Sequence, residues 1–169
     1  MNSLIYANSK IKFYEKSLLP DGFLMSLSKA NSYMDAINML IGSKYIPQDY
    51  KDKSIDEISE FKKAELKDKI KDLETGNIPL DDNKYLFEWY SLEKNLKSNN
   101  SDAENKKIEF LKTKKGDIFG IYPIFAYRYA FLSELRNIRI ILTGKRLGVP
   151  FNEIKERLCI TYVWHMRSW

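Results

Sequence analysis

A chain of 169 residues with 44% hydrophobic and 30% charged residues is long enough to bury a core unaided, and its composition excludes a disordered protein. The single Cys159 excludes an internal disulfide, and one His with one Cys excludes a four-ligand zinc site. We expect a soluble protein of the reducing cytoplasm, because no secretory signal is evident and the most apolar run, residues 118–132, is too short to span a membrane and contains Arg128.

The net charge of +5 is concentrated in one part of the sequence. Residues 1–119 hold 20 Lys against 20 Asp or Glu, whereas residues 120–169 hold two Lys and all six Arg against three Glu. A planar guanidinium suits fixed contacts with carboxylates, phosphates and aromatic rings. These Arg residues therefore either bind a partner or form ion pairs within the fold, and both interpretations stay open.

Helical periodicity dominates the sequence, because apolar residues recur at spacings of three and four and strand patterns are nearly absent. The pattern predicts an all-α protein, a single compact domain over residues 1–169 with about six to eight helices. In the N-terminal segment, residues 1–50, it predicts three short helices over residues 8–19, 22–30 and 32–42. Ser32 and Asp35 form a capping-box-like pair at the start of the third.

Residues 54–115 form a charged middle segment. Ser54 and Glu57 make a second capping pair, which starts a long surface helix that Gly76 ends. One face of this helix is apolar and is made by Ile55, Ile58, Phe61, Leu66, Ile70 and Leu73. Two further helices follow, and the polar run over residues 98–102 predicts a loop between them.

The C-terminal segment, residues 120–163, contains the strongest helix pattern. Its apolar residues lie three or four apart, the spacing of a buried seam: Ile124, Tyr127, Phe131, Leu135, Ile138 and Leu142. We expect this seam to pack against the N-terminal helices through Leu18, Leu24 and Leu40. Gly144 or Gly148 should end the helix, and a short helix should then double back.

Basic side chains lie beside this seam. At about 100° per residue, Arg128 and Arg139 fall within about 20° of each other, and Arg136 lies further round. Arg139 is assigned to the fold, since it lies between Ile138 and Ile140. The predicted partner-binding residues are Arg128, Arg136, Lys145 and Arg146.

No catalytic motif is present, so we expect a protein that is not an enzyme and needs no cofactor. His165 lies near the end of the chain, the glycines do not form a phosphate-binding loop, and Asp81 and Asp82 are neighbours on a predicted turn. The alternative function is DNA binding, because residues 145–158 are similar to the helix-turn-helix of some bacterial regulators. Only eleven residues follow this segment, and the helix before it is very apolar, so nucleic-acid binding is not expected.

Both ends of the sequence carry a family-like motif. Between Pro123 and Val163 the motif residues are Tyr127, Glu134, Asn137, Ile138, Arg139, Gly144, Lys145, Gly148, Ile154, Leu158 and Tyr162. Near the N-terminus they are Tyr6, Leu18, Leu19 and Tyr45. Together they resemble the C subunit of A-type and V-type ATP synthases, the counterpart of the d subunit of vacuolar ATPases. Leu132 departs from the motif, because family members usually carry a glutamate there.

The resemblance implies a non-catalytic subunit of a rotary ATPase that drives proton or sodium ion transport. Its partners would be the central stalk and the proteolipid ring, and it would associate with the inner face of a bacterial membrane through them. Full-length members are much longer and form three similar helical lobes, and residues 54–115 have no counterpart in the motifs. We therefore expect a shortened form with the fold of one lobe.

Overall fold

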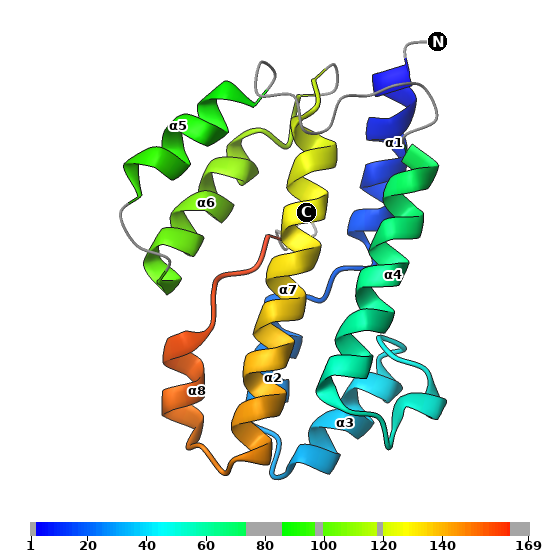
Figure 1. The fold of residues 1–169 in the computed structure, drawn as a ribbon, viewed down its shortest axis with the longest axis vertical. Coiled ribbons are helices and arrows are strands. Elements are labelled where there is room, and N and C mark those ends of the chain that lie inside the picture. Colours follow the sequence, from blue (N-terminus) through cyan, green and yellow to red (C-terminus); the bar gives the residue numbers. More distant parts are fainter. Residues whose placement is uncertain (1–2, 74–85, 97–99, 118–119, 163–169) are drawn as a thin grey trace, which may run out of the picture.

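A computed structural model describes residues 3–73, 86–96, 100–117 and 120–162. Over these residues the chain forms eight α-helices, one short 3-10 helix and no strand, which confirms the predicted all-α domain (Figure 1). The elements are α1 (Ser3–Glu15), α2 (Asp21–Ser28), α3 (Tyr33–Gly42), η1 (Gln48–Tyr50), α4 (Ile55–Leu73), α5 (Phe87–Asn95), α6 (Ser101–Thr113), α7 (Tyr122–Arg146) and α8 (Phe151–Arg157). None of these helices combines the length and the apolar composition needed to cross a bilayer.

Helix α7 organises the fold. It contacts α1, α2, α3, α4, α6 and α8. The predicted seam is buried, and so are Ala130, Asn137 and Ile141 on another side of the helix. In its C-terminal half, α7 lies between α4 and α8, with α2 and α3 behind it (Figure 1).

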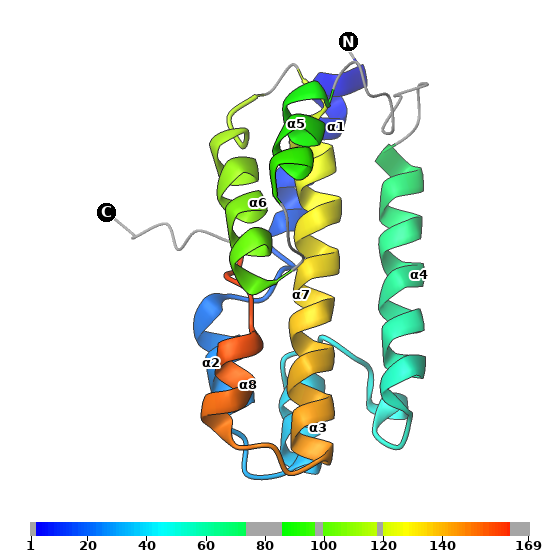
Figure 2. The same cartoon turned by 60° about the vertical axis from the view of Figure 1, so that its left-hand side comes forward.

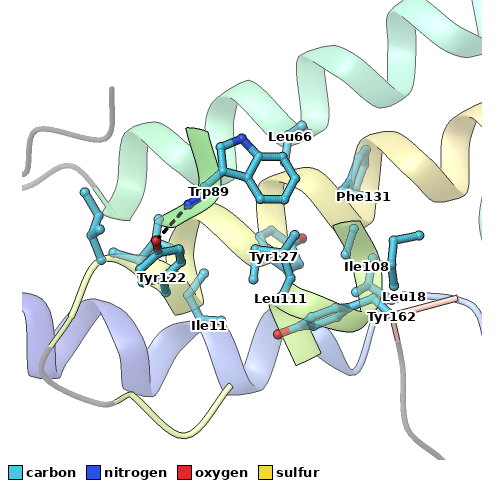
Figure 3. Close-up of a cluster of buried hydrophobic side chains, with 14 of the residues drawn as sticks. Ile11, Leu18, Leu66, Trp89, Ile108, Leu111, Tyr122, Tyr127, Phe131 and Tyr162 are labelled. Atoms are coloured by element: carbon cyan, nitrogen blue, oxygen red, sulfur yellow. Dashed lines mark hydrogen bonds between the residues drawn. The ribbon is translucent and has the colours of Figure 1, made fainter. Parts of the chain in front are cut away.

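The first of two hydrophobic clusters surrounds the N-terminal half of α7. It joins this half to α1, α5, α6 and the end of α4 (Figure 3). The Trp89 ring lies edge-on to Phe125 and to Tyr129, with centroid distances of 4.9 Å to each. The backbone N–H of Trp89 also donates to the Tyr122 hydroxyl at 3.3 Å. Helix α5 is therefore held to α7 through aromatic contacts.

The second cluster surrounds the C-terminal half of α7, where α2, α3, the start of α4 and α8 meet. Leu24 and Leu40 lie in it beside Ile138, and Leu18 lies in the first cluster beside Tyr127. The prediction that the N-terminal helices cover the α7 seam is therefore confirmed.

Both predicted capping pairs are present. The Ser32 hydroxyl accepts a hydrogen bond from the Asp35 N–H at 3.0 Å, and α3 begins at the next residue. Ser54 and Glu57 form a full capping box, in which each side chain accepts from the other's backbone N–H, at 3.2 and 2.8 Å. The predicted end of that helix, at Gly76, lies outside the described residues.

Two predicted boundaries are wrong. The first helix covers Ser3–Glu15 rather than residues 8–19, because Asn8 does not act as a cap: its side chain donates to the Gly120 carbonyl at 3.0 Å. The loop predicted over residues 98–102 ends earlier, because the Asn100 side chain accepts from the Ala103 N–H at 3.0 Å and caps α6. Both errors concern Asn side chains: Asn8 lies inside a helix that it does not cap, whereas Asn100 caps one.

Candidate functional site

The predicted partner-binding residues do not all lie together. Arg136, Lys145 and Arg146 lie on the C-terminal half of α7, whereas Arg128 is exposed about two turns before Arg136. Lys145 and Arg146 form no ion pair with the described residues. Among the described residues, Arg136 has a single long ion-pair contact, with 3.6 Å between its Nη1 and Glu104 Oε2. The structure thus places three of the four cations on one half of the helix.

Arg139 contributes to the fold. Its Nη2 lies 2.9 Å from Asp56 Oδ1, and its Nη1 donates to the Ser59 hydroxyl at 2.9 Å. Both partners belong to α4, so this side chain links the two helices. These bonds support its assignment to the fold rather than to a partner.

A groove of about 670 Å³ follows the outer face of α7, with Lys63 of α4 and Arg157 of α8 among the residues at its sides. Figures 1 and 2 show α4 and α8 on opposite sides of this half of α7. It is lined by Lys63, Leu132, Leu135, Arg136, Arg139, Ile140, Thr143, Gly144, Leu147, Val149, Ile154 and Arg157. Four of these are cations, and none is a carboxylate. A second hollow continues past Arg139 and Thr143 to Arg146, and Asp56, the ion-pair partner of Arg139, also lines it.

The floor of the groove includes an apolar stripe that no other part of the described fold covers. Leu132, Ile140 and Leu147 lie within about 80° on α7. Leu132 is 40% exposed and Leu147 is 72% exposed. Large apolar side chains gathered in a hollow with a polar rim are typical of an interaction site.

The wall formed by α8 depends on two glycines. Gly148 has a φ of +70°, and the Val149 N–H donates to the Gly144 carbonyl at 2.8 Å, which completes a Schellman motif after α7. The predicted stop at Gly148 is confirmed, whereas Gly144 lies inside the helix. A Cβ at Gly144 would lie 2.7 Å from Cγ1 of the buried Ile154. The absence of a side chain there lets α8 pack closely on α7.

Replacing Gly144 by Val should therefore lower the free energy of unfolding by about 1–3 kcal/mol, because the new side chain displaces Ile154. Gly42→Val is the matched control, since Gly42 is an exposed helical glycine with no atom within 4 Å of the added Cβ. Urea denaturation of both variants measures the difference. Equal losses would show that the contact between Gly144 and Ile154 does not fix α8.

The family-like motif residues mostly hold the fold. The Asn137 side chain donates to the Cys159 carbonyl and accepts from the Cys159 N–H, both at 2.9 Å, and so fixes the segment after α8. Ile138 is fully buried in the second cluster. Tyr127 and Tyr162 are buried in the first. These motif residues are therefore not available on the surface.

Glu134 links α7 to the segment between α1 and α2. Its Oε2 accepts a hydrogen bond from the Leu19 backbone N–H at 2.5 Å, between α1 and α2. Burial raises the pKa of Glu134 to about 8, although the Leu19 N–H and the nearby Lys62 ammonium lower it. The carboxyl group is therefore mostly protonated at neutral pH and serves as a buried neutral acceptor.

Residues 82–157 match the family model described as ATP synthase (C/AC39) subunit. This part of the chain, a little less than half of its length, is similar to that family. The resemblance drawn from the sequence motifs is thus confirmed here, and α5 to α8 carry it. No curated protein and no solved structure matches the chain significantly.

The family match does not coincide with the segments inferred from the motifs. It begins at residue 82, inside the middle segment, residues 54–115, for which the motifs gave no counterpart. It does not include residues 1–50, where the N-terminal motif lies. The match therefore runs through the second half of the middle segment and most of the C-terminal segment.

The other candidate sites have less structural support than the groove. Within the described ranges, no three His, Cys, Asp or Glu side chains lie close enough to hold a metal ion. His165, Asp81 and Asp82 lie outside these ranges. Helix α8, the second helix of the helix-turn-helix alternative, is seven residues long and packs on α2 and α7 through the buried Ile154.

The sequence interpretation missed several groove residues: Lys63, Leu132, Leu147 and Arg157. A signal for part of the groove existed, because Leu132, Arg136, Ile140, Thr143 and Leu147 follow at spacings of four, four, three and four. This is a second seam on the helix that already carries the buried one. Lys63 and Arg157 could not be found in this way, since they come from other helices.

Proposed function

We propose that this chain is a non-catalytic protein, similar to the C subunit, of an A-type or V-type rotary ATPase. It links the central stalk to the proteolipid ring on the cytoplasmic side of a bacterial membrane, and so supports rotation-coupled proton or sodium ion transport. The observation that carries the proposal is the family match over residues 82–157. A coupling protein needs docking surfaces rather than reacting groups, and the groove supplies one.

The cations on the C-terminal half of α7 support a docking role. Arg136, Lys145 and Arg146 add positive charge to one half of α7, and two of them form no ion pair with the described residues. Exposed cations of this kind orient a partner and raise its association rate, while buried apolar contact supplies most of the affinity. Membrane association would come through the protein partners.

The test is a pull-down of purified central-stalk and proteolipid-ring subunits from the same organism. The triple variant Arg136→Gln, Lys145→Gln, Arg146→Gln should bind at least about tenfold more weakly and melt within about 2 °C of the unchanged protein, because surface ion pairs contribute little to stability. The control, Lys67→Gln, Lys71→Gln, Lys106→Gln, removes three exposed cations from α4 and α6 and should bind normally.

Two outcomes would contradict the proposal. The first is no capture of stalk or ring subunits by the unchanged protein. The second is sequence-specific binding to duplex DNA at physiological salt, which would support the helix-turn-helix alternative.

A further inference from the structure

We infer that the groove over the outer face of α7 binds one amphipathic helix whose apolar seam is flanked by Asp or Glu on both sides. This inference rests on the proposed function, because it specifies the chemistry of the partner segment that docks there. The juxtaposition behind it is an uncovered apolar stripe with cations from three different helices around it.

The shape of the groove fits a helix. Leu132 and Leu147 are fifteen residues apart on α7, so the stripe is about 22 Å long. Between them, the spacing of four, four, three and four is the spacing by which one helix packs along another. A partner of about fifteen residues, or four turns, therefore covers the stripe from end to end.

The cations lie where they can select an acidic partner. Lys63 approaches from α4 and Arg157 from α8, whereas Arg136 projects from α7 itself. Arg157 forms no ion pair within the described part of the chain. Lys63 pairs with Glu60, which is 71% exposed, and such a surface pair is easily exchanged for another carboxylate.

The apolar floor argues against an anionic ligand without an apolar face. A phosphate backbone would leave Leu132 and Leu147 in contact with polar atoms and gain nothing from burying them. An amphipathic helix buries both, at about 25 cal/mol for each Å² of apolar surface removed from water. A helix bound in the groove therefore contacts both the apolar floor and the surrounding cations.

The experiment uses the full chain and three designed helical peptides of about seventeen residues. The first carries Leu at the seam positions and Glu on both flanks. The second replaces each Glu by Lys, and the third has the composition of the first with its Leu residues spread around the helix. Fluorescence anisotropy should show binding of the first that is at least about tenfold tighter than of either other peptide, and weaker at 500 mM than at 50 mM salt.

A groove variant checks the location. Leu132→Asp with Leu147→Asp should weaken binding of the acidic peptide at least about tenfold, because it removes the apolar contact and repels the Glu flanks. The matched control is Phe13→Asp with Phe87→Asp, which changes two exposed apolar side chains outside the groove and should leave binding intact. Equal binding of the acidic and basic peptides, equal binding of the scattered peptide, or unchanged binding by the groove variant would overturn the inference. Displacement of the acidic peptide by duplex DNA would also overturn it.

The pull-down separates this inference from the proposed function. If stalk and ring subunits bind the groove variant as well as they bind the unchanged protein, the groove assignment fails and the rotary ATPase assignment stands. If the acidic peptide binds as expected and no rotary ATPase component is captured, the assignment to a rotary ATPase fails alone.

Discussion

Replacing Ile138 by Asp should lower the free energy of unfolding by more than about 4 kcal/mol, which is enough to unfold many domains. Ile138 has no exposed surface and lies in the second cluster, where α2, α3 and α7 meet. The substitution removes a buried apolar side chain and leaves a carboxylate among apolar neighbours. Circular dichroism and urea denaturation measure the loss.

Leu132→Asp is the matched control on the same helix. Leu132 is 40% exposed and faces the groove, so its carboxylate stays in water beside Arg136 and the loss should be under about 1 kcal/mol. Two variants with the same stability would mean that the buried and exposed faces of α7 are misassigned.

Replacing Glu134 by Gln should raise the stability of the protein by about 3–5 kcal/mol at pH 8.5 and change it little at pH 4.5. Burial raises the pKa of Glu134 to about 8 in the folded chain, against an ordinary value of 4.5. The folded state therefore holds the proton more tightly than the unfolded state, and stability is lost as the pH rises through this window. Gln keeps an oxygen to accept the Leu19 N–H and has no charge to bury.

The melting temperatures of both proteins are measured from pH 4 to pH 9. The difference between them isolates Glu134, because both proteins share every other titrating side chain. Glu104→Gln is a control of opposite sign. Burial by itself raises the pKa of Glu104. Hydrogen bonds from Tyr129 and Lys107 nevertheless keep this pKa below its ordinary value. Its ionised form therefore stabilises the fold, and the Gln variant should melt lower at neutral pH. A Glu134→Gln curve parallel to that of the unchanged protein would show that Glu134 is ionised throughout.

The sequence predicted the features that depend on neighbours along the chain. The capping box of Ser54 and Glu57 needs only two residues three apart, and the α7 seam needs only a repeated spacing. Both are local rules that the tertiary structure did not override. The partners of that seam could also be named, because few other segments offered enough apolar surface.

The features that the sequence did not predict depend on distant partners. Asn8 is a residue type that often caps helices, but its side-chain N–H donates to the carbonyl of Gly120, 112 residues away. The groove likewise needs Lys63 and Arg157, which the packing of α4 and α8 brings to α7. The motif residue Asn137 has no visible role in the sequence, since its partner is the backbone of Cys159.

The place of α7 in both hydrophobic clusters has a consequence for biosynthesis. The Leu19 N–H donates to Glu134, which lies 115 residues later in the sequence. The apolar faces of α1, α2 and α3 are likewise not fully covered until α7 has been translated. At about 5–20 residues per second, the ribosome needs roughly 6–23 s to reach it. During that interval the nascent chain exposes apolar helix faces, so we expect it to need protection by chaperones and to fold only after most of it has emerged.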